Sequence, residues 1–285
     1  MQTLRNVTQL RRAALGGIIV IFAASVAFAQ PSTHYLSVTY LKTLPGKADA
    51  FRKFAETEMV KMGQMGIDEG VLDAYYVTRL TAPYTTASDY DYSTVVWYKN
   101  RPSLATPDRA SFEARAKKLG YASYQQYLDK RDSLAKPVRT AWRTVIARIG
   151  DIRVGNYLRT ANWQVEPEYR QDTLRFIEEY TMPLANARIS EGRAQGWGLT
   201  RPAAVTGSDD EAGFSFSVSN VAKDSDALMA GPGALTEEVF KKALPGKSYS
   251  AYLNEGNRLF AHRKIVQTRI SEIVALAGAP PKINP

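Results

Sequence analysis

The feature that most constrains the fold of this chain is an internal duplication. The segment "YLSVTYLKTLPGKADAFRKF" begins at Tyr35 and matches "YLRTANWQVEPEYRQDTLRF", which begins 122 residues later at Tyr157. At the same offset, "YYVTRL" at 75–80 aligns with "WGLTRP" at 197–202. Further along, "KKLGYASYQQYL" aligns with "KALPGKSYSAYL" at an offset of 125 residues. Two diverged copies of one unit would show such a small drift across a long loop, so we predict a tandem repeat.

Two copies account for most of the chain and leave a short segment at each end. We place copy one at residues 30–150 and copy two at residues 151–277. Residues 1–29 combine an arginine-containing start, an uncharged apolar run and the small-residue sequence Ala27-Phe28-Ala29. This pattern predicts a cleaved secretory signal peptide, and hence a periplasmic or secreted protein, with an uncleaved membrane anchor as the alternative. The segment "GAPPKINP" at 278–285 is predicted to be a flexible tail.

Each copy shows the same order of predicted elements. A strand rich in aromatic and β-branched residues is followed by a helix that opens at Pro45 or Pro167. Two strands joined by a polar loop come next, then a helical stretch and a final strand. The predicted strands lie near 34–42, 71–80 and 92–99 in copy one and near 156–164, 194–201 and 213–221 in copy two, with "VRTAWRTVIARI" and "KIVQTRISEIVAL" as the final strands. The order β-α-β-β-α-β is that of a ferredoxin-like unit.

A ferredoxin-like unit covers only one face of its four-stranded sheet with helices. The other face also has to be buried, and a second copy in the same chain is the obvious partner. We therefore predict an α+β fold in which two tandem ferredoxin-like β-α-β-β-α-β units pack sheet to sheet as an α+β barrel. Such a barrel would enclose a space between its two sheets.

In its element order and its duplication, the chain resembles the dimeric α+β-barrel superfamily in a fused, two-copy form. That superfamily includes the antibiotic-biosynthesis-monooxygenase, NIPSNAP and EthD-like families. The resemblance covers residues 34–276 and depends on architecture rather than on a diagnostic motif. It implies an α+β barrel and leaves the activity open, because the superfamily includes cofactor-independent oxygenases, isomerases, haem enzymes and proteins with no known activity.

The composition excludes several classes of site. The chain has no cysteine, which rules out a thiol nucleophile, an iron–sulfur cluster and a thiolate metal site. Its only histidines, His34 and His262, are far apart in the sequence, so the usual zinc ligands are missing. In a haem-binding relative, a ligand histidine would be expected on a helix that faces the sheet, and the first predicted helix of copy two contains none. We therefore predict neither a metal nor a cofactor.

The charge balance argues against nucleic acid as a partner. The formal net charge of +9 falls to +6 once Arg5, Arg11 and Arg12 are removed with the signal peptide. No basic motif flanked by aromatic residues is present. No second apolar stretch is long enough to span a membrane, so no membrane contact is expected after cleavage. The expected partner is a small-molecule ligand, and the fused copies make a monomer or a homodimer plausible.

The second strand of each copy carries the predicted ligand site. Residues two apart in a strand share a face, so Tyr75 and Arg79 lie on one side and Trp197 and Arg201 on the equivalent side. Glycines at 196 and 198 on the opposite side suit close packing under helices. We therefore predict that these two arginines and two aromatic rings face the barrel interior and bind an acid. In the alternative interpretation, both arginines lie at strand ends and reach solvent or a carboxylate.

His262 completes the predicted site, and three functions remain open. It precedes the last strand and could bind the ligand or transfer a proton, although a surface position is the alternative. The main prediction is an exported protein that binds a small apolar or aromatic acid between the two sheets. The first alternative is a cofactor-independent enzyme of the monooxygenase or isomerase type. The second is a structural or partner-binding module with a packed interior, so the sequence leaves open whether the protein is an enzyme.

Overall fold

The computed structural model describes residues 34–83, 89–99, 109–204, 213–231 and 233–284. The signal peptide predicted at 1–29 lies outside these residues and stays a prediction. By their contacts, both copies belong to a single compact unit rather than to two. Within the described ranges, no helix combines the length and the apolar character needed to cross a membrane.

The elements follow the predicted order in both copies. Copy one consists of β1 (Tyr35–Thr43), α1 (Ala48–Phe54), a π-helical turn (Ala55–Met59), α2 (Val60–Asp68), β2 (Leu72–Pro83), β3 (Tyr92–Tyr98), α3 (Arg109–Lys118), α4 (Tyr124–Asp132) and β4 (Ala135–Gly150). Copy two consists of β5 (Tyr157–Val165), a 3-10 turn (Pro167–Tyr169), α5 (Arg170–Phe176), a π-helical turn (Ile177–Thr181), α6 (Met182–Ser190), β6 (Gly196–Ala204), β7 (Phe216–Ala222), α7 (Ser225–Ala230), α8 (Glu237–Ala243), α9 (Tyr249–Ala261) and β8 (Arg263–Gly278). The two π-helical turns lie 122 residues apart, which is the offset seen in the sequence.

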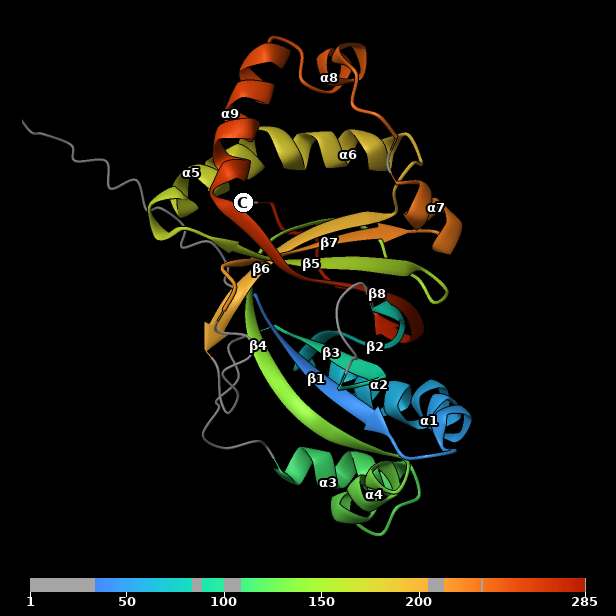
Figure 1. Ribbon diagram of the computed structural model, residues 1–285. Helices are drawn as coiled ribbons and strands as arrows, with labels where there is room; N and C mark the ends of the chain where they lie inside the picture. Colours follow the sequence, from blue (N-terminus) through green and yellow to red (C-terminus); the bar gives the residue numbers. More distant parts are fainter. Residues whose placement is uncertain (1–33, 84–88, 100–108, 205–212, 232, 285) are drawn as a thin grey trace, which may run out of the picture. The chain divides into compact units, whose positions relative to one another are not determined.

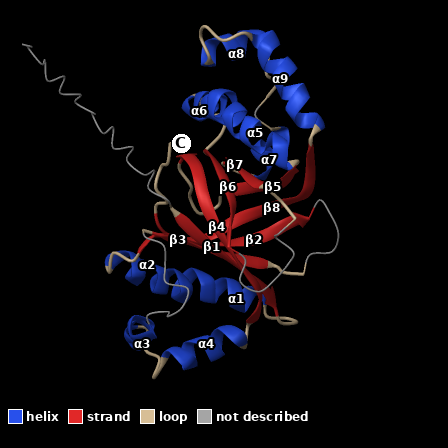
Figure 2. Ribbon diagram, turned by 90° about the vertical axis from the view of Figure 1, so that its left-hand side faces the viewer, coloured by secondary structure: helices blue, strands red, loops and turns tan. Residues whose placement is uncertain are grey.

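The strands form a closed antiparallel barrel in the order β1-β3-β2-β8-β5-β7-β6-β4. Each copy contributes four adjacent strands, and the copies join where β2 pairs with β8 and where β4 pairs with β6. Figures 1 and 2 show the strands as a central layer with the helices of the two copies on opposite sides. The predicted α+β barrel of two ferredoxin-like units is confirmed. Joining the sheets edge to edge also leaves neither sheet with an unpaired edge.

Helices cover the outer surface of the barrel. In copy one, α2 crosses the junction of β2 and β8, and α4 packs on β4. In copy two, α6 packs on β6 and β4, while α7 packs on β7 and β5. The first helical segment of copy one supplies much of the contact, since Phe51, Ala55, Met59 and Met62 are all buried. The opening serines of α4 and α9 also act as N-caps, because Ser123 Oγ accepts from Gln126 N and Ser248 Oγ accepts from Ala251 N.

The second strands face in the direction opposite to the one predicted. Tyr76 and Thr78 of β2 point into the barrel, whereas Tyr75 and Val77 pack under the helices of copy one. The predicted inward direction of the Tyr75–Arg79 face is therefore wrong. The reason is that both faces of β2 are apolar, so alternation does not tell the inside from the helix side. The small residue that allows close packing is on the helix, where Gly63 lies against the ring of Tyr75.

The C-terminal segment is part of the folded unit. Arg148 and Ile283 form a β-bridge, with both backbone hydrogen bonds at 2.8 Å. The Arg148 guanidinium donates to the carbonyl of Pro280 at 2.8 Å, and Pro280 is buried. The flexible tail predicted at 278–285 is therefore wrong for the residues that the structure describes. Composition did not reveal this, because the segment is held by one arginine in β4.

Candidate functional site

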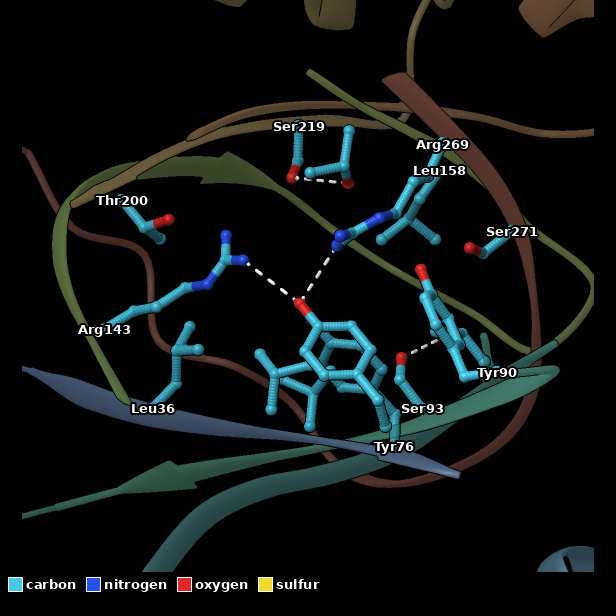
Figure 3. Close-up of a pocket in the computed structure, with 15 residues that line it drawn as sticks. Leu36, Tyr76, Tyr90, Ser93, Arg143, Leu158, Thr200, Ser219, Arg269 and Ser271 are labelled. Atoms are coloured by element: carbon cyan, nitrogen blue, oxygen red, sulfur yellow. Dashed lines mark hydrogen bonds between the residues drawn. The ribbon is translucent and has the colours of Figure 1, made fainter. Parts of the chain in front are cut away.

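A cavity of about 90 Å³ lies inside the barrel, and we call it the central cavity. Both copies contribute to its wall. Its apolar side is formed by Leu36, Val38, Tyr76, Val95 and Leu158, and its polar side by Tyr40, Arg143, Arg269, Thr160, Thr200 and Ser219. Figure 3 shows labelled members of both sides around the same space.

Two arginines reach into the central cavity from equivalent strands. Arg143 is the sixth residue of "VRTAWRTVIARI" and Arg269 is the sixth residue of "KIVQTRISEIVAL". They lie on β4 and β8, the last strands of the two copies, and are only 4% and 9% exposed. Arg143 Nη2 donates to the hydroxyl of Tyr40 at 3.2 Å, and Arg269 Nη1 donates to the same oxygen at 3.0 Å. Figure 3 shows the two guanidinium groups approaching from opposite sides.

Aromatic rings and a third arginine hold Tyr40 in place. The ring of Tyr40 lies 4.7 Å from the ring of Tyr90, centroid to centroid. The guanidinium of Arg139 lies 4.4 Å from the centre of the Tyr40 ring and pairs with Asp89. Burial raises the pKa of the Tyr90 phenol, although the charges of Arg269 and Arg139 oppose it. Tyr90 is therefore neutral at pH 7.

Hydroxyl groups line the rest of the polar side. Thr160 Oγ1 and Ser219 Oγ are 3.1 Å apart, and Thr200 faces the same space. On the other side, Thr78 Oγ1 and Ser93 Oγ are 2.7 Å apart. A hydroxyl can either donate or accept a hydrogen bond, so these groups can adjust to an anion held by the arginines.

The electrostatic character of the central cavity is positive. Among the described residues that line it, two are arginines and none is acidic. Arg269 also donates to Gln267, but its Nε atom is buried and has no hydrogen-bond partner within the described residues. A buried charged group is costly unless it is hydrogen-bonded or neutralised. The cavity is therefore suited to a small anion that presents oxygen atoms to guanidinium groups.

The predicted site residues on the second strands lie outside the central cavity. Tyr75 is under α2, and Arg79 Nη2 lies 2.6 Å from Glu272 Oε2, with 40% of the Arg79 side chain exposed. Arg201 is exposed on β6. Trp197 is buried on the outer face of β6 and borders a second cavity, described below. For Arg79, the structure matches the alternative interpretation, a strand arginine paired with a carboxylate.

His262 lies apart from these four residues. Its ring stacks on Tyr169 with 3.7 Å between centroids, and its Nδ1 lies 2.9 Å from Glu166 Oε2. These contacts connect the end of α9 to the turn after β5, on the outside of the barrel. The structure thus brings none of the five predicted residues into the central cavity.

Sequence reasoning missed Arg143 and Arg269, although a signal for these arginines was present. Aligning the final strands of the two copies places an arginine at the sixth position of each. Two equivalent residues near an axis of internal symmetry can meet, so this match was more informative than the "TR" match in the second strands. Tyr40 had no such partner, because the equivalent residue of copy two is Asn162.

The described residues contain no cluster of three or more histidine, aspartate or glutamate side chains that could hold a metal ion. Among the described residues that line the central cavity, the polar side chains are those of tyrosine, arginine, serine and threonine.

Comparisons with known proteins identify the fold. No family model matches the sequence, and no curated protein matches it. Among solved structures, a candidate monooxygenase from Fusobacterium nucleatum subsp. nucleatum is similar, with 14% identity and a TM-score of 0.53 over 87% of this chain and 95% of that chain. A candidate monooxygenase from Lactobacillus acidophilus shows 9% identity and a TM-score of 0.50 over 87% of this chain and 98% of that chain. At such low identity, the similarity shows a shared ferredoxin-like α+β-barrel fold.

Proposed function

We propose that the protein binds a small organic acid in the central cavity. The observation that carries this proposal is the convergence of two buried guanidinium groups, from Arg143 and Arg269, on the hydroxyl of Tyr40. The planar guanidinium fork matches a carboxylate and can hold it through two parallel hydrogen bonds. The apolar side of the cavity would then receive the body of the ligand.

The size of the cavity limits the ligand. Pockets for drug-sized ligands measure roughly 300–1,000 Å³, whereas the central cavity measures about 90 Å³. The proposed ligand is therefore a compact acid with few non-hydrogen atoms. Leu36, Val38 and Leu158 favour an apolar body over a sugar-like one.

A second candidate function is catalysis on the bound acid without a cofactor. Two guanidinium groups would stabilise negative charge that develops on a substrate oxygen, and the Tyr40 hydroxyl between them is placed to exchange a proton with it. The fold shared with two candidate monooxygenases supports this activity by analogy only. Both monooxygenase-type and isomerase-type chemistry would proceed through a substrate that carries such negative charge on an oxygen.

A ligand screen with matched arginine variants tests the binding proposal. Small organic acids, beginning with acetate, pyruvate and benzoate, would be screened by thermal shift and then by calorimetry. Arg269→Gln should weaken binding about 10- to 100-fold, because it removes a charge-assisted hydrogen bond from an enclosed site. Arg143→Gln should act in the same direction.

Arg79→Gln is the matched control, because Arg79 lies on the outer face of the same barrel and pairs with Glu272. It should leave the affinity unchanged within about twofold, since an exposed pair contributes little. Equal affinity of Arg269→Gln and the unmodified protein for every acid that binds would contradict the proposal. So would the absence of binding by all acids to the folded protein.

A further inference from the structure

A second cavity of about 260 Å³ lies on the outside of the barrel in copy two, and we call it the outer pocket. Its floor is the outer face of β5, β7 and β6. Residues of α6 and α7 form its walls, including Ala185, Arg188 and Leu228. It shares no lining residue with the central cavity.

The floor of the outer pocket carries one row of three side chains. Asn220 of β7 pairs with Arg159 of β5 on one side and with Trp197 of β6 on the other. The row therefore runs from a cationic residue through an amide to an indole ring. Trp197 is only 4% exposed, so its ring forms part of the pocket wall rather than of the protein surface.

The equivalent place in copy one is built differently. There the row consists of Ser37, Val96 and Tyr75, as the pairing of β1, β3 and β2 shows. Tyr75 packs so tightly against Gly63 of α2 that a Cβ atom on this glycine would clash with the ring. In copy one, a tyrosine ring thus occupies the space between the helix and the sheet.

Copy two has replaced these apolar or small residues with larger and polar ones. At the offset of 122 residues, Ala185 stands in place of Gly63 and Arg188 in place of Gly66. On the sheet, Arg159 replaces Ser37, and Asn220 replaces Val96 by strand pairing. Copy two therefore has two arginines, Arg159 and Arg188, in the region where copy one has only packing residues. This difference indicates that the region has a role other than packing in copy two.

The charges in the outer pocket are unbalanced. None of its described lining residues is acidic. Arg193 pairs with Glu191 at 2.8 Å, but neither Arg159 nor Arg188 forms an ion pair within the described residues. The Nε atom of Arg188 is buried and has no hydrogen-bond partner there. Burial lowers the pKa of Arg188, and the nearby charge of Arg193 acts in the same direction.

We propose that the outer pocket binds an oxyanion carried on a small apolar or aromatic body. Arg188, which has no ion pair within the described residues, would hold the oxyanion, and Arg193 would add a second guanidinium while it keeps its pair with Glu191. Arg159, which is exposed, would attract the ligand at the edge of the pocket. Trp197, Leu228 and Ala185 would contact the body. A phosphate ester and a carboxylate share this chemistry, and the proposal does not depend on the function of the central cavity.

Calorimetric titrations of the protein with phenyl phosphate, benzoate and inorganic phosphate test this proposal. Phenyl phosphate or benzoate should bind at the outer pocket with higher affinity than inorganic phosphate, because the ring adds contact with Trp197. Which of the two binds more tightly distinguishes a phosphate site from a carboxylate site. Arg188→Gln should weaken binding at this site by about tenfold or more. Arg159→Gln, at an exposed position, should weaken it by up to about fivefold.

Arg269→Gln serves as the control, since it alters the central cavity alone. Binding at the outer pocket should stay within about twofold in this variant, whereas binding at the central cavity should weaken about 10- to 100-fold. The proposal would be overturned if none of the three probes binds at about 10 mM. It would also be overturned if no binding event responds to Arg188→Gln or Arg159→Gln. Because Arg159 is exposed, Arg159→Gln is a usable test even if Arg188→Gln does not fold.

Discussion

At the scale of single residues, the environment of an arginine decides its role. Arg79 and Arg143 both lie in barrel strands, but Arg79 is 40% exposed in its side chain and pairs with Glu272, whereas Arg143 is 4% exposed as a residue. A pair near solvent contributes little to stability because water screens it. A guanidinium inside the barrel depends on each hydrogen bond it makes, and for Arg143 and Arg269 one acceptor is the Tyr40 hydroxyl.

Replacing Tyr40 with phenylalanine should destabilise the protein. Tyr40→Phe removes an acceptor used by two buried guanidinium groups, which should lower the free energy of unfolding by about 1–3 kcal/mol. Equilibrium unfolding in urea would measure this loss. Tyr98→Phe is a suitable control, because the Tyr98 hydroxyl is 3.4 Å from Ser37 Oγ and makes only a weak hydrogen bond. A loss in Tyr40→Phe no larger than in this control would contradict the prediction.

At the scale of elements, the two copies keep one backbone and differ in how helix and sheet meet. Both have a π-helical turn at the same place, Ala55–Met59 and Ile177–Thr181. The turn is present in copy one, where Tyr75 fills the space between helix and sheet, and in copy two, which has the outer pocket. It is therefore a shared feature of the repeat. The functional difference therefore comes from side chains such as Arg188, which has replaced Gly66.

Helix α2 should not tolerate a larger residue at the point where it meets Tyr75. A methyl group added in Gly63→Ala would clash with the tyrosine ring, so we expect a loss of about 1–3 kcal/mol in unfolding free energy. Thermal and urea unfolding would both detect it. In the control Gly198→Ala, the nearest atom to the new methyl is Ala147 O at 3.7 Å, which is ordinary contact. If both variants were equally stable, close packing at Gly63 would not be a constraint.

At the scale of the whole molecule, the barrel is the unit of structure. The edge strands of copy one, β2 and β4, pair with β3 and β1 on one side and with β8 and β6 of copy two on the other. The central cavity also needs both copies, since Arg143 comes from one and Arg269 from the other. The C-terminal segment adds a further connection, because it returns to β4 and pairs with Arg148.

Removing the C-terminal segment should destabilise the barrel. Truncation after Gly278 would deprive the buried guanidinium of Arg148 of the Pro280 carbonyl, at an expected cost of about 1–3 kcal/mol. The melting temperature should fall accordingly. Truncation after Ile283 is the control, since it keeps the β-bridge and Pro280 and should have little effect. Identical melting temperatures for the two truncations would show that the segment does not support the fold.

The sequence by itself determined the architecture of this protein. Duplication, strand composition and the positions of Pro45 and Pro167 are signals that the sequence carries twice, and a repeated signal is hard to misinterpret. They predicted the element order, the two ferredoxin-like units and their union in an α+β barrel. For the site, the sequence predicted that Arg79 and Arg201 point into the barrel, and the structure places Arg143 and Arg269 of the final strands there instead.

Only the tertiary structure decided which face of each strand is inside. The outer face of β2 packs under helices and the inner face lines the barrel, so Tyr75 and Tyr76 are both in apolar surroundings. The sequence of β2 therefore lacks the polar and apolar alternation that would distinguish the inner face from the outer face. The closure of the barrel brought Arg143 and Arg269 together on Tyr40, across 103 and 229 residues of sequence separation. Packing of helices on the sheet within copy two also left a pocket under α6, whereas Tyr75 fills the equivalent space under α2 in copy one. These are properties of contacts between distant segments, which no local pattern encodes.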